Sequence, residues 1–291
     1  MATLAKPHAA SRVGPLATRK HINSAAKYIA LTLFTLTWLL PIFATLLTSV
    51  RTMDDITLHG FWSLPSKFAI ENFRNAWVAA RVRQYLLNSF IITIPSLLGM
   101  LFLASLSAYA LARFKFRGNL LIYFMYVAGT MLPFQILLLP VFRLTNRLGL
   151  YDTYGALILI HIAFQLGFCT FVMRNFMRTV PGEILDAARV DGCGEFRIYW
   201  QIMLPLSLPS LAALATLEFT WVFNDFLWAL ILLQSDSLRP VTAGLATLQG
   251  QYVTDWPLIT AGALLATLPT VFVFVFLQRY FIQGLTLGSG K

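Results

Sequence analysis

Six long stretches with few or no charged residues constrain the fold of this chain more than any other feature. They are residues 28–50, 85–112, 119–142, 153–173, 204–234 and 257–278. A helix needs about 20 apolar residues to cross a bilayer, and in lipid every backbone polar group must be bonded within the protein. The chain is 58% hydrophobic and 12% charged, which is far more apolar than a soluble domain. We therefore predict an all-α membrane protein with six transmembrane helices.

The segments outside these stretches divide the chain into three predicted parts. Residues 1–27 form a cytoplasmic tail, residues 28–282 a six-span transmembrane domain, and residues 283–291 a cytoplasmic C-terminal tail. The first apolar stretch is longer than the roughly 7–15 residues of a cleavable signal peptide, so we interpret it as a retained anchor.

The distribution of basic residues predicts the orientation of the chain. If the N terminus is cytoplasmic, 14 of the 22 Lys and Arg residues lie on the cytoplasmic side and 8 on the opposite side. Lys and Arg concentrate in cytoplasmic loops, so we expect both termini inside. The net charge of +10 has the same explanation, and we do not expect nucleic acid to be a partner.

The sequence lacks the patterns of a metal site or of a catalytic centre. Cys169 and Cys193 lie in different environments, and the four histidines are scattered along the chain. A phosphate-binding loop requires Gly-x-x-x-x-Gly-Lys-Ser/Thr, but the only Gly-Lys pair is Gly290-Lys291, without a glycine at the required spacing. We predict no metal, no catalytic residue and no ATPase site in this chain.

The loop between the fourth and fifth apolar stretches, residues 179–203, is long and charged. Pro181 suits the start of a helix, and Asp191-Gly192 is typical of a sharp turn. We expect two short helices that meet at this turn. The second helix is expected to run up to Pro205, where the fifth span begins.

A pattern in this loop resembles the signature of the membrane subunits of binding-protein-dependent ATP-binding-cassette (ABC) importers. In that family Glu-Ala-Ala is followed after three residues by Gly, and after nine more by a hydrophobic residue, any residue and Leu-Pro. The matching residues here are Asp186, Ala187, Ala188, Gly192, Leu204 and Pro205. Two positions depart from the pattern, because Asp186 replaces the usual Glu and Cys193 the usual Ala.

The resemblance implies that this coupling loop docks in a cleft of an ATP-binding subunit. The two alanines leave one flank of the first helix nearly bare, which would let it seat in a groove of another protein. The residues assigned to this coupling are Asp186, Ala187, Ala188, Asp191, Gly192 and Pro205.

Nearly the whole chain from about residue 28 shares the resemblance. Residues 109–118, 221–226 and 278–288 are similar to the carbohydrate-uptake branch, specifically to its second permease subunit. This implies a type I importer fold in a bacterial cytoplasmic (inner) membrane. It also implies a second homologous permease, two ATP-binding subunits, which would bind ATP and magnesium, and an extracytoplasmic solute-binding protein. We expect no cofactor in this chain.

The fifth stretch carries two acids, Glu218 and Asp225, seven residues apart and hence on one side of a helix. A carboxylate in the bilayer costs about 2.5–3.5 kcal/mol on insertion scales and usually faces the bundle interior or a wet cavity. One interpretation makes both acids, with Trp221 and Asn224, part of a solute pathway, because carboxylates and amides bond sugar hydroxyls. The other interpretation is structural, in which they bond neighbouring helices.

These observations predict an ABC importer permease that forms, with its partner, the pathway for a sugar or sugar-like solute. The alternative is a secondary transporter driven by an ion gradient, with Glu218 or Asp225 carrying the proton. Such carriers often contain inverted repeats, and no repeat pairs the first three spans with the last three. The sequence does not name the solute.

Overall fold

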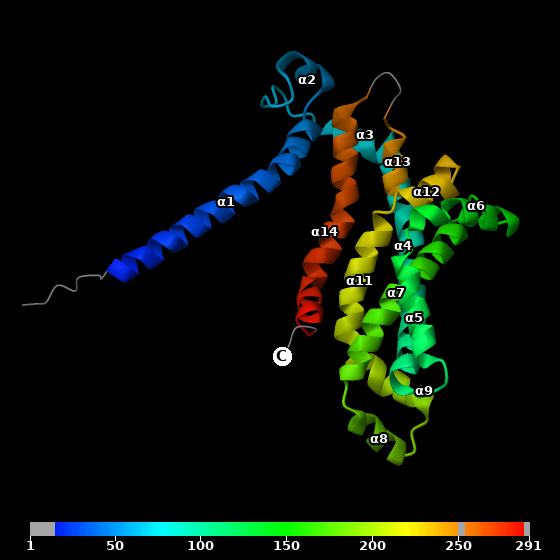
Figure 1. The fold of residues 1–291 in the computed structure, drawn as a ribbon. Coiled ribbons are helices and arrows are strands. Elements are labelled where there is room, and N and C mark those ends of the chain that lie inside the picture. Colours follow the sequence, from blue (N-terminus) through cyan, green and yellow to red (C-terminus); the bar gives the residue numbers. More distant parts are fainter. Residues whose placement is uncertain (1–14, 250–253, 288–291) are drawn as a thin grey trace, which may run out of the picture.

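The computed structural model describes residues 15–249 and 254–287, and the side chains of residues 27–249 and 254–279. The described residues are largely helical, which confirms the all-α prediction (Figure 1). The helices are α1 (Pro15–Ser49), α2 (Met53–His59), α3 (Glu71–Val78), α4 (Val82–Arg113), α5 (Asn119–Met131), α6 (Leu138–Arg147), α7 (Tyr154–Thr179), α8 (Gly182–Val190), α9 (Glu195–Ile198), α10 (Leu204–Leu206), α11 (Leu208–Phe223), α12 (Leu227–Leu232), α13 (Val241–Ala246) and α14 (Trp256–Leu287).

Four helices contain segments that are long and apolar enough to cross a membrane unaided. These segments are Lys27–Ser49, Val82–Arg113, Tyr154–Thr179 and Trp256–Arg279. Two bent helix pairs raise the number to six if each pair is one span. The helix of the fourth predicted span continues to Thr179, and α14 extends through residues 283–287 of the predicted C-terminal tail. Residues 1–14 and 288–291 of the two predicted tails lie outside the described residues.

The third predicted span, residues 119–142, is not one helix. Helix α5 ends at Met131, and the chain turns by 91° into a 3₁₀ turn, Phe134–Leu137, and then α6. The cause is Pro133, which disfavours helical backbone at the residue before it, and Leu132 is extended accordingly. The expectation of a continuous helix to Phe142 was wrong for this reason.

The fifth predicted span, residues 204–234, is broken twice. Helix α9 continues through a π-helical segment, Tyr199–Met203, into α10, and the chain bends by 69° at Ser207 before α11. Helix α11 ends at Phe223, and α12 begins only at Leu227. The second loop helix therefore runs through Pro205 as expected, but the helix of the fifth span begins three residues later, at Leu208.

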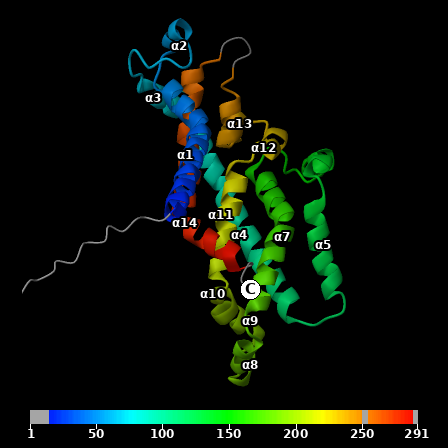
Figure 2. The same ribbon diagram turned by 60° about the vertical axis from the view of Figure 1, so that its left-hand side comes forward.

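The core of the bundle is the pair α4 and α7, whose contact is the most extensive in the molecule. Small residues at the centre of α4, Ala104 and Ala108, are fully buried and let the helices approach closely. Helix α11 packs against α14 and also contacts α4, whereas α1 packs mainly on α14 (Figures 1 and 2). The apolar span of α1 is almost wholly uncovered, so within a membrane its surface meets lipid or another subunit.

Glycine 167 of α7 marks the closest approach of α5. A Cβ added at Gly167 would lie 2.6 Å from the backbone oxygen of Tyr126, which cannot move without shifting α5. A Cβ at Gly99 would meet the side chain of Ile162, with Cδ1 at 2.5 Å and Cγ1 at 3.2 Å. We expect Gly167→Ala to destabilise the protein by about 1–3 kcal/mol and Gly99→Ala by clearly less, because Ile162 can change rotamer. Thermal unfolding of both variants in the same detergent tests this, and equal losses would contradict it.

Candidate functional site

A cavity of about 910 Å³ lies among α5, α7, α11, α12 and α14. It brings together all four residues that the sequence placed in a solute pathway. They are Glu218, Trp221, Asn224 and Asp225. Its other polar lining residues include His161 and Gln165, which are four residues apart on α7.

Glu218 lies in the wall of this cavity and is 1% exposed. Its Oε2 has no hydrogen-bond partner among the described residues, while the thiol of Cys169 lies beside the carboxyl group. A buried polar atom without a partner costs about 1–3 kcal/mol, so such atoms call for an explanation. The residue that carries this atom lines the cavity, which places an unused acceptor in its wall.

Asp225 does not lie on the helix that carries Glu218, so the expectation that both stand two turns apart on one helix was wrong. It occupies the break between α11 and α12. Its carboxylate accepts a hydrogen bond from the backbone N–H of Ala229 at 3.2 Å, and the N–H of Trp228 lies at 3.5 Å. The hydroxyl of Thr242 donates to its backbone oxygen. Asp225 thus caps α12 and also lines the cavity, with the Nε2 atom of His161 3.8 Å from its carboxylate.

Asn224 and Trp221 are exposed on the same cavity wall. The Asn224 amide nitrogen donates to the oxygen of Thr220 at 2.8 Å, which leaves the amide oxygen free to accept. Trp221 is 61% exposed and offers a flat apolar face. Polar acceptors beside an uncovered aromatic ring are the groups that bind a sugar, whose hydroxyls donate and whose ring faces stack.

Sequence reasoning missed two features of this cavity. Gln165 and His161 are polar residues in the apolar N-terminal half of α7, and their spacing of four residues is the signal that could have found them. The second feature is an aromatic cluster, in which the ring centroid of Trp228 lies 5.2 Å from that of Phe164 and 6.3 Å from that of Phe134. It comes from three separate segments, so no local pattern indicates it.

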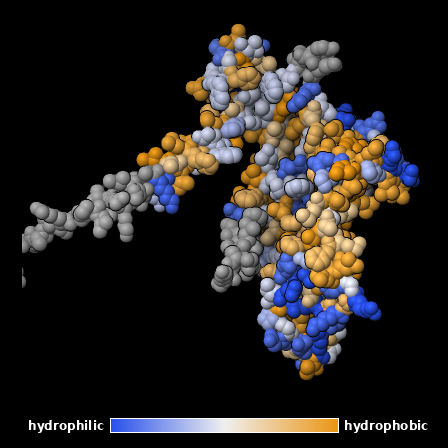
Figure 3. All heavy atoms as spheres, in the orientation of Figure 1, coloured by the Kyte–Doolittle hydropathy of each residue, from blue (hydrophilic) through white to orange (hydrophobic). Residues whose placement is uncertain are grey.

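The coupling loop forms the tip of one end of the bundle, where hydrophilic side chains gather (Figure 3). Helix α8 ends at a tight turn in which Gly192 has φ +79°, a conformation that side chains other than glycine rarely adopt. The N–H groups of Asp191, Gly192 and Cys193 donate to the last carbonyls of α8. The two-helix hairpin expected from Asp191-Gly192 is therefore present.

The two alanines of the signature have different surroundings. Ala188 and Leu185 are buried against the bundle, whereas Ala187 is exposed. Ala187 shares the outer face of α8 with Ile184 and with Val190, which is 88% exposed. The sequence expectation that both alanines bare one flank is wrong in this detail, because successive residues of a helix point about 100° apart.

A chain of hydrogen bonds ties the coupling loop to α4. Arg189 donates to Asp186 at 2.6 Å and to Glu195 at 2.8 Å, and the Tyr109 hydroxyl of α4 donates to Glu195 at 2.7 Å. The hydrogen bonds from Arg189 and then Tyr109 hold the pKa of Glu195 below its ordinary value. Glu195 therefore stays charged at neutral pH, and charge-assisted hydrogen bonds link the loop to the end of α4.

The opposite end of α7 is joined to α12 through Asp152. This residue adopts φ +59°, and its carboxylate accepts hydrogen bonds from the N–H groups of Gln234 and Ser235 at 2.8 and 2.9 Å. Its own N–H donates to Leu232. Helix α12 is thus fixed to the turn before α7, rather than to α11.

Comparison with known proteins places this architecture. Residues 100–287 match the family described as binding-protein-dependent transport system inner membrane component. A probable ABC transporter permease of Bacillus subtilis is 32% identical over 93% of this chain and 90% of its own length. An arabinooligosaccharide transport system permease of Halalkalibacterium halodurans is 37% identical over 86% of this chain and 90% of its own.

Solved structures show the same fold. A chain of a bacterial ABC transporter involved in the import of the acidic polysaccharide alginate superposes with a TM-score of 0.80. The match has 20% sequence identity and covers 90% of this chain and 98% of that one. The matched family covers well over half of the chain and includes both the cavity and the coupling loop. This protein belongs to the family of binding-protein-dependent transport system inner membrane components.

Proposed function

We propose that this chain is one of two permease subunits of an ATP-driven importer for a sugar or sugar-like solute. Relatives that match most of its length are named for arabinooligosaccharide and diacetylchitobiose uptake. The observation that carries the proposal is a cavity, in a member of this family, that is lined by the exposed ring of Trp221 and by two residues with unused acceptors. These acceptors are Oε2 of Glu218 and the amide oxygen of Asn224. The cavity residues Glu218, Trp221 and Asn224 would contact the passing solute, with Asp225 chiefly holding α12.

The remaining subunits would bind at the two ends of the bundle. The exposed outer face of α8 offers a small apolar surface, flanked by Asp186, for an ATP-binding subunit, which would hold ATP and magnesium and carry out hydrolysis. The end that carries α2, α3 and α12 would face the solute-binding protein. A solved structural neighbour is described in complex with an alginate-pentasaccharide-bound periplasmic protein, which supports a solute-binding protein as a partner. Both termini would then lie in the cytoplasm.

An ion-gradient-driven carrier is disfavoured by the family match and by the coupling loop, which such a carrier would not need. The test uses the assembled importer in vesicles loaded with ATP, with and without an uncoupler of the proton gradient. We expect uptake to require internal ATP and to continue when the gradient is collapsed. Uptake that ignores ATP and stops with the uncoupler would overturn the proposal.

A further inference from the structure

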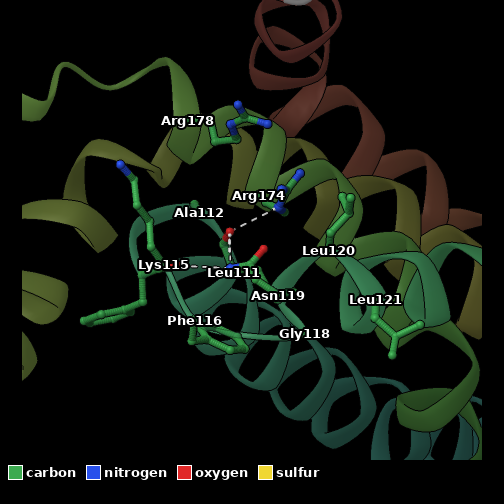
Figure 4. A pocket seen from close by; sticks show the side chains of 11 residues that line it. Leu111, Ala112, Lys115, Phe116, Gly118, Asn119, Leu120, Leu121, Arg174 and Arg178 are labelled. Atoms are coloured by element: carbon green, nitrogen blue, oxygen red, sulfur yellow. Dashed lines mark hydrogen bonds between the residues drawn. The ribbon is translucent and has the colours of Figure 1, made fainter.

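A second cavity, of about 610 Å³, lies between the α4–α5 turn and the C-terminal half of α7, near the end of the bundle that carries α8 and α9. It is open to the surroundings and distinct from the cavity around Glu218. Figure 4 shows Lys115 reaching it from the turn, and Arg174 and Arg178 entering it from α7. Three cationic side chains from two separate segments therefore surround one hollow.

The charge around this hollow is of one sign. Within the part of the chain that the structure describes, no acidic residue lines it, and the sequence contains no Asp or Glu between Glu71 and Asp152. Among the described residues, none forms an ion pair with Lys115, Arg174 or Arg178. Concave surfaces lined by one sign of charge concentrate ions of the opposite sign. The hollow is therefore an attractive site for an anion.

Arg174 is held in place before any ligand arrives. It is 8% exposed, its Nε donates to the oxygen of Leu111 at 3.3 Å, and its guanidinium lies 3.9 Å from the ring centroid of Tyr123. Its two terminal nitrogens have no acceptor among the described residues. A guanidinium fixed on one edge, with its other N–H groups free, is arranged for the oxygens of a phosphate or carboxylate.

The start of α5 adds backbone donors on the same side. Gly118 precedes this 13-residue helix and provides no side-chain cap. The Asn119 amide turns away from its own helix and donates to Leu111 and Phe114 at 3.2 and 2.9 Å. The first-turn amides of Leu120 and Leu121 are thus left without a side-chain acceptor, and a helix N-terminus favours an anion.

The rim of the hollow is apolar. The side chains of Phe114, Phe116, Leu120 and Leu121 are all exposed there. Basic residues at cytoplasmic helix ends are expected for orientation alone, but orientation does not require that they surround one hollow with a fixed arginine in its wall. Cationic groups below an apolar rim suit an anion that carries an apolar chain better than they suit a small soluble anion.

We propose that this hollow binds a phosphate-type anion, namely the phosphodiester headgroup of an anionic phospholipid whose acyl chains lie against the apolar rim. Basic pockets between transmembrane helices on the cytoplasmic side are suited to such headgroups. The assignment to the cytoplasmic leaflet rests on the orientation given under the proposed function. The binding itself rests only on the geometry of the hollow.

The experiment measures lipid binding to the full-length chain in neutral detergent by native mass spectrometry. The probes are phosphatidylglycerol, phosphatidylcholine and inorganic phosphate. We expect phosphatidylglycerol to bind more tightly than phosphatidylcholine, and Lys115→Gln and Arg178→Gln each to weaken it by about fivefold. Arg117→Gln is the matched control, because Arg117 lies in the same turn but does not line the hollow.

The possible results distinguish a lipid headgroup from a free phosphate, or contradict the proposal. Competition by millimolar inorganic phosphate would support the anion site and assign it to a free phosphate. Equal binding of the two lipids, or an equal loss in Arg117→Gln, would overturn the proposal, because surface charge alone would then suffice. This experiment does not measure transport, so an absence of lipid binding would leave the importer proposal standing. Conversely, lipid binding can still be measured if ATP-driven uptake is not found.

Discussion

Replacing Gly192 by valine is expected to lower solute uptake by roughly tenfold or more while the chain still inserts and folds. The turn holds Gly192 at φ +79°, where a residue with a Cβ costs about 1–2 kcal/mol and a β-branched residue more. That cost lowers the population of the native turn relative to other loop conformations by roughly 5- to 30-fold. The outer face of α8 would then no longer be presented to the ATP-binding subunit.

The matched control is Gly194→Val, two residues along the same loop. Both glycines have open space where a Cβ would stand, but Gly194 has φ −72°, which any residue adopts. The two variants therefore add the same side chain and differ in backbone strain. Uptake and ATP hydrolysis by the assembled complex provide the measurement. Equal activity of Gly192→Val and Gly194→Val would remove the geometric basis for the coupling role.

A charge reversal at Asp186 tests the outer face of α8 through its electrostatics rather than through the backbone of the turn. Asp186 is 71% exposed and bonds to Arg189, so Asp186→Lys places two cations side by side at the edge of the outer face. The free energy of unfolding should change little, because exposed ion pairs contribute about 0–1 kcal/mol. The expected loss is in uptake, and wild-type uptake would exclude Asp186 from the contact.

The second large effect is expected at Glu218. Glu218→Gln keeps the size of the side chain but replaces one of its two carboxyl oxygens, both of which can accept hydrogen bonds, by an NH₂ group that can only donate. If the unpartnered Oε2 binds a solute hydroxyl, this loss of about 1–2 kcal/mol reduces uptake roughly 5- to 30-fold at low solute concentration.

Thr216→Val is the control for Glu218→Gln. Thr216 is also buried and lines the same cavity, but its hydroxyl already donates to the oxygen of Ala212 at 2.8 Å. Its replacement should leave uptake near the wild-type level. Concentration-dependent uptake measures both variants, and thermal unfolding verifies that each is folded. Normal uptake by Glu218→Gln would leave this acid a purely structural role.

The sequence indicated the helices well where a single physical signal dominated. The uninterrupted apolar runs of α4, α7 and α14 predicted long helices, because bilayer thickness and backbone bonding allow no other structure. The turn at Gly192 followed from residue chemistry. The ends of helices were less predictable, since α7 continues six residues beyond its apolar run, to Thr179, and hydropathy alone does not show where a helix leaves the membrane.

The bends at Pro133 and around Asp225 could not be read from hydropathy, because both segments remain apolar on either side of the break. Pro133 was visible in the sequence, but proline within an apolar run is compatible with a kinked span as well as with a turn of 91°. Tertiary contacts decide between these. At Asp225 the deciding contact comes from Thr242, which is 17 residues away in the chain.

The cavity was predictable in its residue types but not in its shape. Two acids in an apolar segment indicate an interior site for polar groups, and the structure places both acids in the wall of one cavity. The positions of Trp228, Phe164 and Phe134 depend on how three separate segments pack, and no spacing in the sequence encodes that. The hydrogen bonds between Tyr109 and the coupling loop are equally non-local, because the partners are 86 residues apart.

Because the fifth span is broken at both ends of α11, we treat this helix as a rigid rod with a flexible joint at each end. At one joint, Ser207, the rod meets the segment that continues into the coupling loop, and at the other it meets α12, which Asp152 holds against α7. A displacement of the loop would therefore swing α11 about its far joint instead of bending it. Glu218 lies five residues before the α12 end of α11, so such a movement would shift its carboxylate in the wall of the cavity.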